Sequence, residues 1–507
     1  MHVKYAHDIS CFFLFTAYDI FAISYIVYTG RKEWTMIKRK KSGYTPAAAG
    51  RKACNISKSY TAVYLFLALF ILTMIGAGNA FTVGVLGIIL CAEGFVRKEV
   101  EVDLWVLVPL IVYNLFSAVS SYMVYGNIAE GYISTQMIYP LLYLLMACLD
   151  EEEKKLLKRL CVGWVGAIAI IGVVQFVLQS VTQGARRLSV ILGNPNALGI
   201  FLVIGWFMLM AVLEAETEGK AKDRQTDKCI LLLSGLEPMI MIALALTLSM
   251  GSFAAMAGGI LVILISKRMS FRQTLQYACR LLARAALGMG TGILLYLAAD
   301  RTGMPWICIF LAVYAAALAM CWSTFDRFLR ACPRVAASIS ATGFLVAAAA
   351  VTVRPSSLAT FAERLEMMRN GMGYLAENPL LGVGPYQWRL LNLADGDKYF
   401  NTWHIHNVLI HVGVELGMVA MVMLVVVAVR YYRKSRQSIE RGGFTAFLLH
   451  NLMDTSFFYM GVTALTLLTV GRPKEGGVKL SAVVSRLLFG AFAMFFAWEL
   501  YLSLWPA

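Results

Sequence analysis

The sequence predicts an all-α polytopic membrane protein. Of its 507 residues, 59% are hydrophobic, and the mean hydropathy is +0.68, far above the usual values for soluble globular proteins. Apolar runs long enough to span a bilayer recur along the chain, for example over 104–119, 161–177 and 408–429. We expect roughly 13–16 transmembrane helices and one large outer loop that carries an amphipathic helix.

The first apolar run, Ile9–Tyr28, is predicted to be a spanning helix. Only one lysine precedes it, and no small-residue cleavage site follows it, so it does not resemble a signal peptide. The segments 29–60, 267–284 and 430–441 are basic, as the positive-inside rule expects of cytoplasmic loops. The net charge of +15 therefore reflects topology and does not indicate a nucleic-acid partner.

With these basic segments in the cytoplasm, the chain divides into four regions. They are 1–159 with N-terminal transmembrane helices and a basic cytoplasmic loop, 160–351 as a transmembrane core, 352–403 as an extracytoplasmic loop, and 404–507 with C-terminal transmembrane helices. No internal repeat of the kind that transporters carry is evident.

Several arginines fall on the predicted outer side, where the positive-inside rule gives no reason for them. They are Arg186 and Arg187 after the sixth span, and Arg354, Arg364, Arg369 and Arg389 in the large outer loop. A planar guanidinium that is always charged suits bidentate binding of phosphate. The alternative is that they are ordinary arginines in solvent or at the level of the lipid headgroups.

The segment 361–377 predicts an amphipathic helix. Its apolar residues recur at helical spacing and form one stripe, which comprises Phe361, Leu365, Met368, Met372 and Leu375. Arg364 and Arg369 flank this stripe, so a helix lying in the outer interface would hold both at phosphate depth. The alternative is a helix that caps the bundle and carries these arginines incidentally.

A second predicted anion site lies at the start of the seventh span. Asn194 is a favourable N-cap and Pro195 suits the first helical position, so a helix begins here. Its free backbone N–H groups face the outer surface beside Arg186 and Arg187, an arrangement that binds anions. We therefore take Asn194 and Asn196 as candidate substrate-binding residues.

Two histidines precede the thirteenth span. A helix N-terminus lowers the pKa of a histidine, which keeps the ring neutral, and we take His406 as a candidate general base. His404, His411 and Glu415 are weaker candidates, since His411 and Glu415 could equally form a satisfied structural pair. His450 and Asp454 form a similar pair with the same alternative. No acidic or thiol partner stands at metal-ligand spacing from the histidines, and the ten cysteines are scattered singly, so no metal site is predicted.

These residues resemble the O-antigen ligase and polymerase family of bacterial membrane glycosyltransferases. In chain order, the shared motifs are Arg187 with Gly193-Asn194-Pro195-Asn196, Arg364 with Asn378-Pro379-Leu380-Leu381-Gly382-Val383-Gly384, and His406-Asn407 with Glu415-Leu416-Gly417. The last one fits the family pattern of histidine, a polar residue, nine residues and glycine. Between the eighth and ninth spans the family usually has Ser-Arg-Gly, where this chain reads Ser249-Met250-Gly251.

The resemblance implies a GT-C-like helical bundle with metal-independent, inverting glycosyltransferase activity and no cofactor. The donor would be a glycan on undecaprenyl diphosphate, and the acceptor a hydroxyl of another glycan or lipid at the outer face of the bacterial cytoplasmic membrane. The arginines would neutralise the diphosphate, and His406 would activate the acceptor. The motifs add Gly382, Gly384 and Asn407 to the candidate substrate-binding residues.

Two other classes of protein remain open. A transporter or flippase of lipid-linked saccharides would also use outer arginines and many spans, but would more often carry charges inside several spans and an internal repeat. A membrane scaffold without catalysis is the third class, and the absence of an arginine at Met250 keeps it open.

The predicted topology can be tested directly. A Ser357→Cys variant should react with a membrane-impermeant thiol reagent in intact cells, because the segments that flank 352–403 are basic and cytoplasmic. Labelling that appears only after lysis would contradict the whole map.

Overall fold

The computed structural model describes residues 60–505 except 77, 98–99, 219–223, 302–304, 354–355, 396–401, 436 and 470–476. The described residues belong to one compact unit, Ser57–Ala507. The predicted first span and most of the basic segment that follows it lie outside the described residues. The predicted region boundaries at 159 and 351 fall inside helices, in α7 and α13.

The described chain is almost entirely helical. Its helices are α2 (Tyr60–Met74), α3 (Ala80–Val96), α4 (Leu104–Tyr125), α5 (Ile133–Gln136), α6 (Ile138–Ala147), α7 (Glu151–Gln183), α8 (Pro195–Glu218), α9 (Arg224–Leu246), α10 (Met250–Ser266), α11 (Phe271–Arg301), α12 (Pro305–Ala331), α13 (Pro333–Val353), α14 (Ser356–Glu377), α15 (Gln387–Ala394), α16 (Val408–Lys434), α17 (Ser438–Asn451), α18 (Met460–Thr469) and α19 (Ala482–Leu504). Single 3₁₀ turns lie at Val190–Leu192 and Ser456–Phe458, and the short strands β1 (Val100–Val102) and β2 (Val478–Leu480) pair antiparallel.

Seven of the described helices are long and apolar enough to cross a membrane, namely α4, α7, α8, α11, α12, α16 and α19. Six shorter apolar segments of 10–17 residues accompany them. The architecture is that of an all-α polytopic membrane protein, as predicted. The finer prediction of 13–16 spans in a GT-C-like arrangement stays a prediction.

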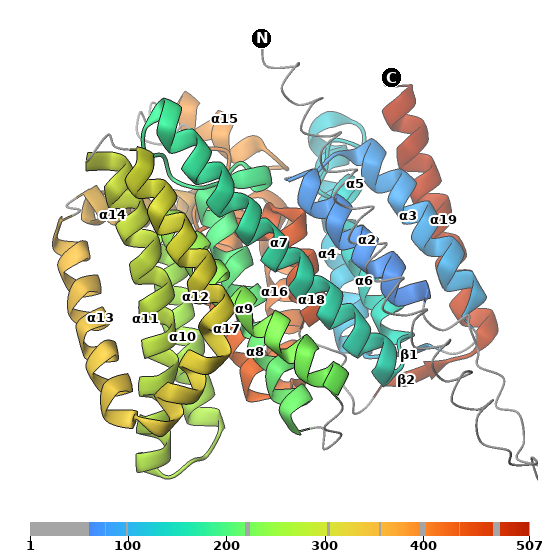
Figure 1. Ribbon diagram of the computed structural model, residues 1–507. Coiled ribbons are helices and arrows are strands. Elements are labelled where there is room, and N and C mark those ends of the chain that lie inside the picture. The colour runs from blue at the N-terminus through green and yellow to red at the C-terminus, as the bar shows by residue number, and fades with distance from the viewer. Residues whose placement is uncertain are drawn as a thin grey trace, which may run out of the picture. The chain divides into compact units, whose positions relative to one another are not determined.

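The helices pack side by side as a bundle (Figure 1). The closest pairs are α10 with α17, α3 with α19, α9 with α11 and α4 with α16. Helix α8 is almost entirely buried, whereas α12 and α19 are mostly exposed, so α8 lies at the centre of the core and the other two at its edge. An apolar face on a peripheral helix is expected where lipid is the solvent.

The two ends of the bundle differ in chemistry. One end, which we call the basic end, carries the β1–β2 pair and interhelical ion pairs such as Lys158–Glu440, Lys267–Glu214 and Arg430–Asp103. At the other end, which we call the site end, the ends of α7, α9 and α17 meet the starts of α8, α10 and α16. The site end gathers most of the candidate residues.

The basic segments are more helical than the sequence suggested. Helix α11 begins at Phe271, so Arg272, Arg280 and Arg284 lie in a helix and not in a loop. The reason is that Arg280 and Arg284 find partners: Arg280 is bidentate to Asp326 of α12, which lets the polar start of α11 continue as a helix.

A buried ion-pair network joins α9, α11 and α12. Glu237 is fully buried, pairs with Arg284, and accepts hydrogen bonds from the indole N–H groups of Trp206 at 3.1 Å and Trp322 at 2.8 Å. Arg284 also lies 3.6 Å from Asp326. Charges buried in this way are stable only when they are paired and hydrogen-bonded, and here they are.

Helix α16 is broken at Gly417, and the turn 379–384 fills the break. Gly417 has a φ of 85°, so the carbonyls of Val414 and Glu415 lose their helical partners. They accept instead from the backbone N–H groups of Val383 at 2.8 Å and Gly384 at 3.0 Å. The N–H of Met418 donates to the carbonyl of Pro379 at 2.8 Å. The turn 379–384 is thus hydrogen-bonded into the helix itself.

The break predicts that Gly417→Ala destabilises the protein. A Cβ there would overlap the Leu380 carbonyl, and the positive φ is strained for alanine by about 1–3 kcal/mol. The matched control is Gly373→Ala in α14, where no atom lies within 4 Å of an added Cβ. Thermal unfolding in detergent should show a lower Tm for Gly417→Ala alone. Equal Tm values for the two variants would contradict the role of the break.

Candidate functional site

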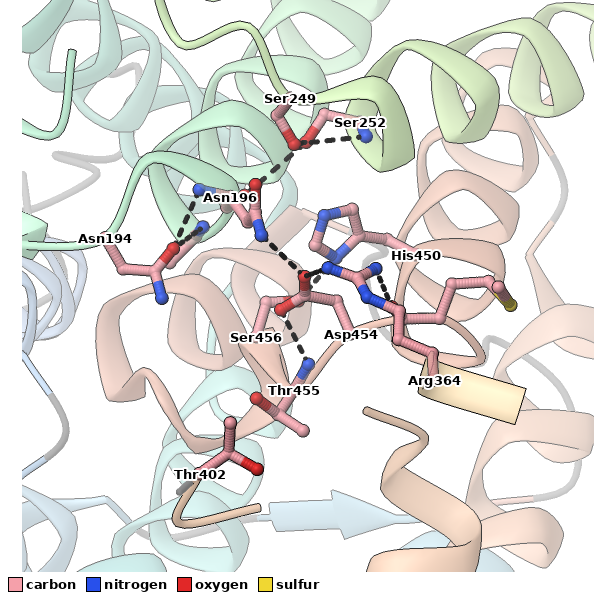
Figure 2. Close-up of polar contacts among 12 residues, drawn as sticks. Asn194, Asn196, Ser249, Ser252, Arg364, Thr402, His450, Asp454, Thr455 and Ser456 are labelled. Atoms are coloured by element: carbon pink, nitrogen blue, oxygen red, sulfur yellow. Dashed lines mark hydrogen bonds and ion pairs between the residues drawn. The ribbon is translucent and has the colours of Figure 1, made fainter. Parts of the chain in front are cut away.

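Polar side chains from distant segments meet at the site end (Figure 2). We call Arg187, Asn196, Arg364, His406 and Asp454 the polar cluster. They come from the segment before α8, from α8 itself, from α14, from the start of α16 and from the turn after α17. Sequence analysis placed four of them in one site, and the structure brings these four together around a fifth, Asp454.

A chain of hydrogen bonds runs from Arg187 to Asp454. The Nε of Arg187 donates to the carbonyl of Thr247 at 2.9 Å, and its Nη2 donates to Oδ1 of Asn196 at 2.8 Å. The Nδ2 of Asn196 donates in turn to Oδ2 of Asp454 at 2.8 Å. The side chain of Asn196 therefore links the Asp454 carboxylate to the Arg187 guanidinium.

Arg364 approaches the same carboxylate from α14. Its Nη1 donates to the carbonyl of Met453, and its Nη2 lies 3.4 Å from Oδ2 of Asp454. In Figure 2, Arg364 and Asn196 both point toward Asp454, which is buried. Arg364 thus contacts the carboxylate directly, whereas Arg187 is linked to it through Asn196. With two guanidinium groups and one carboxylate, the cluster has an excess of positive charge that favours an anionic ligand.

Asn194 has the role that the sequence predicts. Its Oδ1 accepts from the backbone N–H groups of Asn196 at 2.8 Å and Ala197 at 3.3 Å, which caps α8 directly beside the cluster. Ser249 caps α10 in the same region, and the hydroxyl of Ser252 donates to the carbonyl of Asn196 at 3.4 Å. The starts of two helices therefore converge on Asn196.

His406 lies just before α16 and is half-buried. Burial lowers the pKa of His406, the Arg364 charge lowers this pKa further, and the Asp454 charge opposes both effects. The imidazole is therefore neutral at pH 7 and lies within the field of both charged residues. Its Nδ1 is buried and has no hydrogen-bond partner in the described part of the chain, which leaves the ring able to accept a proton.

Asn407 is the N-cap of α16. Its Oδ1 accepts from the Ile410 N–H at 3.1 Å, and its Nδ2 donates to the carbonyl of Leu452 at 3.1 Å. Asn407 thus ties the start of α16 to the turn that carries Asp454, and so holds His406 near the arginines.

The three weaker candidates, His404, His411 and Glu415, form a buried layer beneath His406. The ring of His404 stacks on Phe458 with centres 4.5 Å apart, and its centre lies 4.9 Å from that of His411. Burial lowers the pKa of His404 to about 4, so this ring is neutral as well.

Tyr132 connects this layer by hydrogen bonds. Its hydroxyl lies 3.1 Å from Nε2 of His411 and donates to the Glu415 carboxylate. The Nδ1 of His411 accepts from the N–H of Ile405 at 3.4 Å. The Glu415–Tyr132–His411 chain therefore fixes the backbone immediately before His406, which is a positioning role.

Four other candidates lie outside the polar cluster. Arg186 and Arg369 are exposed, with Arg369 turned away from the side of α14 that carries Arg364. Gly382 and Gly384 belong to the turn that fills the break in α16, and both have positive φ values. In the described structure the turn that contains these glycines contacts the backbone of α16 at Glu415. The predicted contact of the glycines with substrate stays a prediction.

Helix α14 packs on one side and leaves most of the predicted apolar stripe exposed. Met367, Gly371 and Leu375 are buried against the start of α16, whereas Phe361, Leu365 and Met372 are exposed. Gly371 lets α14 approach Ile405 closely, and this selects the side of the helix that packs. The predicted burial of the stripe in the membrane interface stays a prediction. The exposed side is left available to lipid.

The sequence indicates Asp454 only as one of a pair with His450, and it does not indicate Tyr132 at all. In the structure Asp454 and His450 have different partners: Asp454 accepts from Asn196, whereas Nδ1 of His450 lies 3.0 Å from the Ser456 hydroxyl. A buried aspartate between two short apolar segments was the available signal for Asp454. Tyr132 carried no signal, because a tyrosine near the end of a span is ordinary.

Comparison with known proteins gives no relative: no protein-family model matches the chain, and no curated protein matches it significantly. Among the residues that the structure describes, no group of three or more His, Cys, Asp or Glu side chains could hold a metal ion. The predicted metal independence is a separate matter and stays a prediction.

Proposed function

We propose that the protein is a membrane glycosyltransferase that moves a glycan from an undecaprenyl-diphosphate carrier to an acceptor hydroxyl, as a surface polysaccharide polymerase or ligase. The observation that carries the proposal is the polar cluster: Arg364 pairs with the Asp454 carboxylate, Arg187 is linked to the same carboxylate through Asn196, and a neutral histidine lies beside them at one end of a membrane bundle. The resemblance of the motifs around these residues to O-antigen ligases and polymerases supports the same reaction.

The chemistry requires one proton acceptor and stabilisation of a dianionic leaving group. The acceptor oxygen attacks the anomeric carbon while His406 takes its proton, and the carbon–oxygen bond to the diphosphate breaks with the electron pair leaving on the diphosphate. Arg187 and Arg364 stabilise the charge that develops there. Attack opposite to the leaving group inverts the anomeric configuration.

We further propose that the site faces outward from the bacterial cytoplasmic membrane. The basic residues of the described chain, such as Lys158, Lys267 and Arg430, gather at the end opposite the polar cluster. The positive-inside rule assigns that end to the cytoplasm. An outer site would reach a lipid-linked donor in the bilayer and a glycan acceptor in the aqueous phase.

The chain departs from the family pattern at Met250. Met250 opens α10 after the cap Ser249 and is exposed, so it provides no charge for a diphosphate. In our proposal the diphosphate is therefore held by Arg187, from the segment before α8, and by Arg364 of α14.

The alternative of a flippase for lipid-linked saccharides draws support from one observation. The buried network of Glu237, Arg284 and Asp326 places charges inside the apolar bundle, as transporters often do. These charges pair with one another and with Trp206 and Trp322, so they serve best as a structural link. Translocation of a labelled lipid-linked saccharide across vesicles, without transfer, would favour the flippase.

The base assignment predicts that His406→Ala lowers turnover by about 10²–10⁴ and leaves donor binding largely intact. His404→Ala should do less, because His404 stacks on Phe458 beneath the site. The measurement is product against time for purified protein in lipid with a polyprenyl-diphosphate glycan and an acceptor.

The same assay gives a pH test. Because burial lowers the pKa of His406, the active neutral form persists at pH 6.5, the ordinary pKa of histidine, and kcat should decline only as the pH falls below it. Turnover of His406→Ala equal to that of the unaltered protein would remove the base from the mechanism.

The proposed binding of the diphosphate by the arginines leads to a second prediction. Arg187→Ala and Arg364→Ala should each abolish polymer formation at a near-normal protein level, and lysine at either position should also impair it, because lysine lacks the planar fork. Arg433→Ala, which removes an exposed arginine from the far end of α16, is the matched control and should be active. Full activity of both site variants would contradict the diphosphate-binding role.

A further inference from the structure

A second polar feature lies at the basic end, far along the helices from the polar cluster. A cavity of 410 Å³ opens between the start of α11 and the end of α12. Its polar lining comes from Gln273, Gln276, Tyr277, Arg280 and Arg330. Figure 1 shows α11, α12 and α13 as a group at one edge of the bundle.

The cavity carries an excess of positive charge. Arg280 donates from Nε and Nη2 to the two oxygens of Asp326 at 2.8 and 2.6 Å, and Arg330 donates to Oδ2 of the same carboxylate at 3.1 and 2.8 Å. Arg284, behind them, is neutralised by Glu237. One carboxylate thus serves both cavity arginines, and each guanidinium has further N–H donors beyond the two that it uses here.

Apolar side chains flank this charged lining. Phe271 is 84% exposed, Leu275 53% and Phe328 47%, and all three lie on the helices that form the cavity. Both helices are long and apolar enough to span a membrane. A ligand in the cavity would therefore place a polar end among arginine and glutamine and an apolar end along exposed phenylalanine and leucine.

We propose that this cavity binds the phosphate headgroup of an anionic phospholipid from the leaflet at the basic end. Arginine forks and amide donors fit phosphodiester oxygens, and basic pockets between spanning helices are suited to such headgroups. The exposed apolar residues favour a lipid over free phosphate, because they give the acyl chains a surface. The site is independent of the proposed transfer reaction, and its test does not use activity.

The test is a titration of the purified full-length protein in detergent micelles. Short-chain phosphatidylglycerol, short-chain phosphatidylcholine and inorganic phosphate are added separately, and the rise in Tm is followed as a binding isotherm. We expect a saturable rise with phosphatidylglycerol, which phosphatidylcholine and inorganic phosphate do not match at equal concentration.

Two matched pairs of variants locate the site. Arg330→Gln is compared with Arg327→Gln, which removes an exposed arginine of the same helix that does not line the cavity. Gln276→Glu is compared with Gln437→Glu, which adds the same charge at an exposed residue outside the cavity. Loss of a positive charge in Arg330→Gln and gain of a negative charge in Gln276→Glu should each weaken phosphatidylglycerol binding by about tenfold. The two controls should bind as the unaltered protein does.

Any of three outcomes would overturn the proposal. Equal stabilisation by phosphatidylglycerol and phosphatidylcholine, or an unchanged Kd in both cavity variants, would leave the cavity without a role in anion binding. Saturation by inorganic phosphate as strong as that by phosphatidylglycerol would assign the cavity to a soluble anion. Because Gln276 is exposed and forms no internal ion pair, its variant tests the site even if Arg330→Gln unfolds.

Discussion

The carboxylate of Asp454 is the contact on which the candidate site depends. It is buried, and it accepts a hydrogen bond from Asn196 and pairs with Arg364, so it joins α8 to α14. A buried charge without partners is strongly unfavourable, and removing one partner of a buried pair is destabilising. The contacts that stabilise the buried charge of Asp454 therefore also hold the arginines in place, Arg364 directly and Arg187 through Asn196. With two arginines and one aspartate, the site has a net positive charge.

The break in α16 provides the second constraint. An unbroken helix would satisfy the Val414 and Glu415 carbonyls internally, and the turn 379–384 would then have no anchor. With the break, the turn is fixed to α16, and the layer of His411, Tyr132 and Glu415 fixes the backbone before His406. The histidine and the arginines thus belong to elements that cannot shift independently. This preorganisation is what a site that stabilises developing charge requires.

The sequence predicted the parts of this arrangement that depend on local pattern. Apolar runs gave the helices, and Asn194-Pro195 gave the start of α8, because a cap acts over three residues. Arg187 and Arg364 stand out in the sequence because arginine is unexpected in segments that are predicted to lie on the outer side.

The partners of these arginines could not be predicted. Asn196 and Asp454 are 258 residues apart, and only tertiary packing brings them together. The side of α14 that packs on the protein could not be predicted for a similar reason: Gly371 decides it by allowing close approach to Ile405, and an apolar pattern takes no account of glycine. The basic start of α11 is helical because Asp326 is close in space, although it is distant in sequence.

The most direct test of the account is transfer by the purified protein in lipid, with a polyprenyl-diphosphate glycan as donor and a chelator present throughout. The account predicts one polyprenyl diphosphate released for each new glycosidic bond, with inverted anomeric configuration read by NMR. Absence of any transfer, retention of configuration, or a strict requirement for a divalent metal would contradict it.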